Sequence, residues 1–258
     1  MSSILQDRRD QISIVQLNRP QKYNALSREM ILALADIFTN LDSEPDLRAI
    51  ILTGAGDEAF CAGTDIAELT ELDEDRAREV STRGQALCNQ IENCGVPVIA
   101  AINGIAAGGG CELALACHIR IASPNAEFSL PETKLGIIPA YGGTQRLARE
   151  IGHGRALEMM LTGRTIGAAE ALKFGLINHV AAVGELLASA ESLAREIAAL
   201  APLAIRASLE AVIRGAELPL AEGLELEAKL FASLFATNDV REGTRAFLEK
   251  RAPVFKGE

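Results

Sequence analysis

The chain has 258 residues and a formal net charge of −10, with 25 Lys and Arg residues against 35 Asp and Glu. This acidic balance disfavours binding to nucleic acids, which needs a basic stripe, and to anionic membranes. Only 4% of the residues are aromatic, so the chain also offers few rings on which bases could stack. Five cysteines without a C-x-x-C pair form no zinc motif and no disulfide framework, and residues 1–20 contain no apolar signal-peptide segment, so we expect a cytoplasmic protein.

Short apolar strands alternate with amphipathic helices through the first half of the chain, which favours an α/β fold. Strands are predicted at 12–17, 47–52, 98–102, 119–122 and 127–129. Helices are predicted from the N-cap Ser27 to about Leu41, from Asp73 to Glu92 and from about Cys111 to His118, with a helical turn at 66–69.

The second half is predicted to be mostly helical from Thr144 onward, with Gly152, Gly163 and Gly175 as helix ends. No strand signal follows about Glu196. A helical tail on an α/β core is often an assembly element. We therefore divide the chain into a core, residues 1–195, and a helical oligomerisation region, residues 196–258.

The segment from Val96 to Cys117 carries a single charge and is long enough to cross a bilayer. However, Asn103-Gly104 is a turn signal, and three successive glycines follow at 108–110. The segment is therefore predicted to form short elements of a buried core rather than a membrane span.

A faint internal repeat joins residues 49–69 to residues 98–115, about 45 positions later. Each copy reads as a strand, a loop of small residues and a helix start. Because a helix N-terminus presents unpaired backbone N–H groups, the repeat predicts two similar sites for an anion or a developing oxyanion.

Glu112 is the only charged residue between Val96 and Ile119, and a carboxylate in such apolar surroundings is costly unless it has a function or a partner. Glu132 follows 20 residues later, beside another glycine-rich loop. Two carboxylates on separate elements can supply a general base and a general acid. A solvated helix residue and an exposed loop residue are the plain alternatives.

Other catalytic motifs are weak or missing in the sequence. Residues 54–59 spell G-x-G-x-x-A after an apolar strand, but no helix begins inside the motif, which disfavours a dinucleotide site. The three histidines stand outside metal-binding patterns, so no metal is expected, and there is no G-x-S-x-G sequence of a serine hydrolase.

The glycine-rich segment at 99–113 resembles the enoyl-CoA hydratase/isomerase (crotonase) family. Further matches lie, in the family's order, at 17–20, 24–26, 60–66, 128–132, 142–147 and 247–251. The resemblance implies a crotonase-like spiral of ββα repeats carrying an acyl-CoA site, followed by a C-terminal helical trimerisation region. It also implies a homotrimer, or a homohexamer built as a dimer of trimers.

The resemblance also implies the chemistry of an enoyl-CoA hydratase, a lyase of β-oxidation or of a related acyl-CoA degradation. The N–H groups of Thr64 and Gly109 would form an oxyanion hole for the thioester carbonyl. Glu112 would activate the water that attacks C3 of a 2-trans-enoyl-CoA, and Glu132 would deliver a proton to C2. The implied substrate-binding residues are Lys22, Ala62, Asp65, Ile66, Ala140, Tyr141 and Lys250. No cofactor is implied, because CoA is part of the substrate, and other β-oxidation enzymes are the expected partners.

Two departures from the family pattern concern the pocket. Thr64 stands where hydratases usually have Ala, and Ala140-Tyr141 stands where they commonly have Gly-Ala. A Δ3,Δ2-enoyl-CoA isomerase or another acyl-CoA lyase of the family is the alternative. Some relatives bind RNA, but this sequence offers no basic arm for it. Its positive charge instead gathers near the C-terminus, around Lys250 and Lys256, where it could meet the CoA phosphates.

Overall fold

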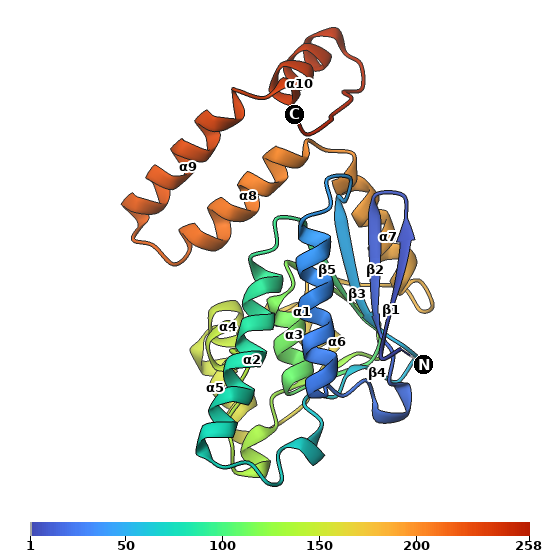
Figure 1. The fold of residues 1–258 in the computed structure, drawn as a ribbon, viewed down its shortest axis with the longest axis vertical. Helices are drawn as coiled ribbons and strands as arrows, with labels where there is room; N and C mark the ends of the chain where they lie inside the picture. Colours follow the sequence, from blue (N-terminus) through green and yellow to red (C-terminus); the bar gives the residue numbers. More distant parts are fainter. Residues whose placement is uncertain (1) are drawn as a thin grey trace.

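A computed structural model describes residues 2–258, which form two small sheets surrounded by helices (Figure 1). The larger sheet has the strand order β1-β2-β3-β5-β7-β10. Its strands are β1 (Ile4–Arg9), β2 (Ile12–Leu17), β3 (Ala49–Gly54), β5 (Val98–Ile102), β7 (Ile119–Ala122) and β10 (His179–Val180). The β1–β2 pair is antiparallel, and all later pairs in this sheet are parallel.

The smaller sheet has the order β4-β6-β8-β9, with β9 antiparallel to its neighbour. Its strands are β4 (Ala59–Cys61), β6 (Ile105–Ala107), β8 (Glu127–Ser129) and β9 (Ile166–Gly167). The two sheets arise from one repeated unit, in which a strand of the larger sheet is followed by a strand of the smaller sheet and a helical turn. The order of elements confirms the predicted repeat, whose two copies begin at β3 and β5. A third copy runs through β7, β8 and a 3-10 helix at Glu132–Leu135.

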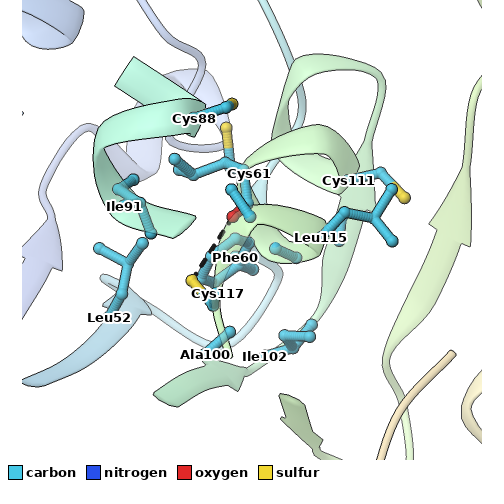
Figure 2. Packing of buried hydrophobic residues seen from close by; sticks show 14 of the residues in the cluster. Leu52, Phe60, Cys61, Cys88, Ile91, Ala100, Ile102, Cys111, Leu115 and Cys117 are labelled. Carbon is cyan, nitrogen blue, oxygen red and sulfur yellow. Dashed lines mark hydrogen bonds between the residues drawn. The ribbon is translucent and has the colours of Figure 1, made fainter. Parts of the chain in front are cut away.

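Both faces of the larger sheet are buried, which explains its continuous apolar strands. On one face, Val98, Ala100 and Ile102 join the main core, and on the other Ile99 and Ala101 pack toward α7. Figure 2 shows the main core from close by, with Leu52, Ala100 and Ile102 of the sheet near Ile91 and Leu115 of two helices. All five cysteines are buried and unpaired.

Seven helices surround the sheets: α1 (Arg28–Asp42), α2 (Glu74–Glu92), α3 (Gly109–Ala116), α4 (Gly143–Ile151), α5 (His153–Thr162), α6 (Ala168–Phe174) and α7 (Leu186–Ala198). The predicted N-cap Ser27 accepts from Met30 N. Asp73, predicted as the first residue of its helix, is the N-cap of α2 and accepts from Arg76 N. Short 3-10 helices at Pro20–Lys22 and Ile66–Glu68 complete the core.

Three helices project from the core: α8 (Pro202–Gly215), α9 (Leu220–Leu234) and α10 (Asn238–Glu249). Helices α8 and α9 pack on each other as a hairpin and bury none of their side chains (Figure 1). Large apolar side chains are left exposed along this region, namely Val212, Leu220, Leu224, Phe231, Phe235, Phe247 and Leu248. The predicted division at residue 195 stays a prediction. Helix α7, which crosses that position, packs on the larger sheet.

The structure differs from the sequence prediction at several element boundaries. The helix expected from about Cys111 begins at Gly109, because Gly108 adopts φ 52° and ends the preceding strand there. The strand expected at 47–52 runs from Ala49 to Gly54, and β1, β4 and β6 were not predicted. Within residues 2–258, no helix combines the length and apolarity needed to cross a membrane.

Candidate active site

An isolated parallel β-bridge between Thr64 and Leu26 fixes the direction in which the backbone N–H of Thr64 points. Leu26 N donates to Gly63 O at 2.7 Å, and Asp65 N donates to Leu26 O at 2.9 Å. Because successive backbone groups of an extended segment point to opposite sides, the N–H of Thr64 points away from Leu26. It has no hydrogen-bond acceptor among residues 2–258.

The N–H of Gly109 is available for a different reason. Gly109 is the first residue of α3, and the first N–H groups of a helix have no partner within it. Only Gly tolerates the φ 52° and ψ −127° of the preceding residue, Gly108, whose own N–H donates to Ser129 O at 2.9 Å.

These two donors lie next to each other. A Cβ built on Gly63 would stand 3.3 Å from Gly109 N, and one on Gly109 would stand 3.2 Å from Thr64 Oγ1. The two predicted oxyanion-hole residues are thus brought together from two copies of the repeat, and both begin where a strand of the smaller sheet ends. Such an arrangement can donate two hydrogen bonds to one carbonyl oxygen.

Glu112 lies in the first turn of α3 and is 2% exposed. Its Oε1 accepts from the backbone N–H of Tyr141 at 2.8 Å and from that of Gly143 at 2.6 Å. The carboxylate is therefore a partnered buried group held by the loop before α4, rather than a solvated helix residue. Burial nevertheless raises its pKa to about 7, against the opposing effect of the amide of Gly143.

Glu132 is half-buried at the start of the 3-10 helix that follows β8. Its Oε1 would lie 2.9 Å from a Cβ on Gly108, which places the carboxyl beside the start of α3. Its Oε2 is buried and finds no hydrogen-bond partner within residues 2–258. Burial raises the pKa of Glu132, and its charge in turn raises the pKa of Glu112.

Both carboxyls thus belong to elements that meet the two free N–H groups, and the charge of Glu132 acts on the pKa of Glu112. The two backbone donors at Glu112 favour its ionised form, while the unpartnered Oε2 of Glu132 has room for a proton. One base and one acid thus flank the same small volume, which suits a reaction that moves protons beside a polarised carbonyl.

Tyr141 closes one side of this volume. Its side chain is 3% exposed, and the hydroxyl of Thr64 donates to its hydroxyl at 2.9 Å. The ring lies between two glycines of different helices: a Cβ on Gly109 would be 3.0 Å from Cε2, and a Cβ on Gly84 only 1.9 Å from Cδ1. The two departures from the family pattern, Thr64 and Tyr141, therefore contact each other.

The other predicted residues on the N-terminal side lie close to Thr64 in the chain or to its neighbour Asp65. Asp65 pairs with Arg19 at 3.0 Å, and the hydrogen bond from Arg19 lowers the pKa of the Asp65 carboxyl. Lys22 is exposed and close enough to lower that pKa further. Ala62 and Ile66 are exposed on either side of Thr64.

Ala140 and Lys250 differ in their relation to the site. Ala140 precedes Tyr141, and its carbonyl accepts from Ser81 Oγ at 2.8 Å, which ties the loop to α2. Lys250 is exposed at the C-cap of α10, and Figure 1 places α10 away from α3 and β4. Within one chain, Lys250 is not brought to the carboxyl pair.

Sequence reasoning missed three features of the site. They are the backbone N–H donors to Glu112, the hydrogen bond between the hydroxyls of Thr64 and Tyr141, and the close contact of the Tyr141 ring with Gly84 of α2. The glycine pair 142–143 after Tyr141 was the signal for the first, because a Cβ on Gly143 would lie 2.8 Å from Cγ of Glu112. In the chain from Ser2 to Glu258, no group of three His, Cys, Asp or Glu side chains is placed to hold a metal ion.

Comparisons with known proteins show the family of this chain. A family model described as enoyl-CoA hydratase/isomerase matches residues 7–258. The crotonyl-CoA hydratase of Syntrophomonas wolfei is 41% identical over 98% of this chain and 97% of its own, and the short-chain-enoyl-CoA hydratase of Clostridium acetobutylicum is 38% identical over 97% and 96%. The crystal structure of an enoyl-CoA hydratase from Bacillus anthracis superposes with a TM-score of 0.96 at 43% identity, covering all of both chains.

Proposed function

The chain belongs to the enoyl-CoA hydratase/isomerase family, and we propose that it is an enoyl-CoA hydratase. It adds water across the C2=C3 bond of a 2-trans-enoyl-CoA and gives a 3-hydroxyacyl-CoA. One observation carries this assignment: two carboxyls, one that accepts two backbone N–H bonds and one with room for a proton, lie beside two free backbone N–H groups.

The thioester carbonyl oxygen accepts from the N–H groups of Thr64 and Gly109. As water adds to C3, negative charge moves through C2 to this oxygen, and the two donors stabilise it in surroundings with little water. Removal of one such donor typically costs about 10²–10³ in rate.

Glu112 acts as the general base and Glu132 as the general acid. The oxygen of a water bonds to C3 while one of its protons passes to Glu112, and the π electrons of the C2=C3 bond become the enolate. The enolate then takes a proton from Glu132 at C2. After release of the product, Glu112 carries the proton that it took from water, and Glu132 lacks the proton that it gave to C2. Exchange with solvent restores both.

The substrate supplies CoA, and we propose no further cofactor or metal. Lys22, Ala62, Asp65 and Ile66 are the residues that we propose contact the CoA portion of the substrate. Their position near Thr64 supports this, since Ala62, Asp65 and Ile66 flank it in the chain and Lys22 acts on the pKa of Asp65. The pathway that we infer is β-oxidation or a related degradation of acyl-CoA esters, with neighbouring enzymes of that pathway as partners. Five buried, unpaired cysteines favour the reducing cytoplasm.

We also propose that the chain forms a homotrimer or a trimer-based homohexamer through α8, α9 and α10. Side chains such as Leu220 and Phe247 are 79% and 83% exposed in one chain, and contiguous apolar surface of this kind marks an interface. Lys250 would meet the CoA phosphates of a neighbouring subunit in such an assembly.

Hydration of crotonyl-CoA, followed as loss of the enoyl absorbance, tests the function. Steady loss of absorbance is expected, with 3-hydroxybutyryl-CoA as the product. The competing isomerase function predicts no change with crotonyl-CoA and conversion of a 3-enoyl-CoA instead, and that outcome would overturn the assignment.

A further inference from the structure

A large cavity lies directly behind the loop that carries Tyr141. It has a volume of about 1240 Å³ and is bounded by α2, the loop 136–142, the first turns of α4, and α8. Ala140 and Gly142, the two neighbours of Tyr141 in the chain, both line it, whereas Tyr141, Glu112 and Glu132 do not. The cavity and the carboxyl pair therefore lie on opposite sides of one residue.

The cavity wall is mixed. It contains an aliphatic set of side chains, namely Leu69, Leu72, Ala77, Val80, Ile137 and Ile138, beside polar residues such as Ser81 and Gln85, which donate to the carbonyl of Ala140. Val80 precedes Gly84 by one turn of α2, so the ring of Tyr141 meets α2 beside the cavity wall.

The ring is held firmly in this position. Gly84 and Gly109 enclose its two edges, and the hydroxyl pair with Thr64 fixes its tip. Gly84 is a costly residue within a helix, since Gly lowers helix stability relative to Ala, and the close contact with Tyr141 explains its presence.

We propose that Tyr141 determines the acyl-chain length that this enzyme accepts, by closing the catalytic site on the side of this cavity. This inference rests on the proposed hydratase function. With the thioester carbonyl at Thr64 and Gly109 and the reacting carbons between Glu112 and Glu132, the ring occupies the path of the chain beyond about C4. The native substrates are therefore short enoyl groups, and the cavity is a latent extension of the acyl site.

The test compares kcat/KM for trans-2-enoyl-CoA esters of four, six, eight and ten carbons. The wild-type enzyme is expected to prefer the four-carbon ester. Tyr141→Ala removes the ring, joins the site to the cavity and raises the ratio of eight-carbon to four-carbon kcat/KM by at least about tenfold, because each CH₂ placed in apolar surroundings favours binding roughly fourfold.

Two further variants identify the ring as the cause. Tyr141→Phe keeps the ring and loses only the hydroxyl, so its chain-length ratios should match the wild type. Val80→Phe in the Tyr141→Ala background refills the cavity and should reverse the gain. Where Tyr141→Ala fails to fold, Tyr141→Leu serves as a smaller truncation and should shift the ratio in the same direction.

The outcomes separate the two proposals. If the wild type hydrates none of the esters, the proposed function fails. If the wild type hydrates crotonyl-CoA but the truncated variants keep the wild-type ratios, the function stands and the role of Tyr141 is refuted. A wild type that already prefers eight or ten carbons also refutes it.

Discussion

The backbone N–H of Gly143 donates to Oε1 of Glu112 at 2.6 Å, and the two residues are so close that a Cβ on Gly143 would lie 2.8 Å from Cγ of Glu112. The first residue of α4 thus holds a carboxylate in the first turn of α3. A base held by backbone groups keeps its orientation without reorganisation during the reaction, which is how a site on rigid elements is pre-organised.

Glu112→Gln and Glu132→Gln are each expected to lower kcat for crotonyl-CoA hydration by about 10²–10⁴, since each removes one proton-transfer group. Glutamine has nearly the same shape as glutamate, and at residue 112 its amide oxygen can still accept from Tyr141 N and Gly143 N. The oligomeric state, measured by light scattering, should therefore not change. Near-normal turnover in either variant would show that its residue has no proton-transfer role.

The activity should depend on pH through the carboxyl pair. The proposed base, Glu112, must be ionised, and burial raises its pKa to about 7, so kcat/KM should increase as the pH rises through about 7. Glu132 must be protonated, and its raised pKa implies a fall in kcat/KM at higher pH. The profile is measured with crotonyl-CoA from pH 5 to 9 with enzyme-free blanks. A flat profile below pH 8 would contradict the assignment of the base.

Glu112 should also make stability depend on pH. Its pKa is raised from 4.5 to about 7 in the folded state, so the folded chain binds more protons than the unfolded chain between these values. The contribution to stability is fully present below about pH 4.5 and is lost as the pH rises through about 7. Glu112→Gln removes this loss, which is on the order of 3 kcal/mol at pH 8.

Melting temperatures of wild type and Glu112→Gln at pH 5 and pH 8 test the sign. The variant should gain stability relative to the wild type as the pH rises. An equal difference at both pH values would mean that Glu112 titrates normally.

The parts of the fold that depend on local chemistry could be predicted from the sequence. Ser27 was identified as a helix cap because a cap bonds to a residue only three positions away. The strand at Val98–Ile102 was found because both of its faces are buried, which makes it uniformly apolar. Glu112 stood out for the same reason, as one charge in an apolar run.

The parts that depend on long-range contact could not be predicted. Strands β4 and β6 have only three residues each and exist because they pair with each other across more than 40 positions. The ring of Tyr141 packs against Gly84 from 57 positions away. No local pattern encodes such a pair, so the sequence showed that residue 141 was unusual but not what it contacts.

Lys250 and Lys256 offer a test of where the CoA phosphates bind. Both are exposed in the C-terminal segment, and we expect the double variant to alanine to raise KM for crotonyl-CoA more than it lowers kcat, because these lysines contact no reacting atom. Lys229→Ala is a matched control on the same helical region, since Lys229 pairs with Glu225 at 2.7 Å. An unchanged KM in the double variant would place the phosphates elsewhere.

The contact between Gly84 and the ring of Tyr141 can be tested without an activity assay, by a double-mutant cycle of the two residues. In the wild type, Gly84→Ala places a Cβ 1.9 Å from Cδ1 of the ring, and overpacking of this kind costs about 1–3 kcal/mol of unfolding free energy. In the Tyr141→Ala background the clash is gone, and the better helix propensity of alanine should stabilise the chain by up to about 1 kcal/mol. The effect of Gly84→Ala on the free energy of unfolding therefore changes sign between the two backgrounds, and urea denaturation can measure it.

Gly154→Ala, in α5, is the control. A Cβ at this position would meet no neighbouring side chain or packed element within 4 Å, so the effect of the substitution should be the same in both backgrounds. If Gly84→Ala were equally destabilising with and without the ring, the contact between α2 and Tyr141 would not be the reason for this glycine.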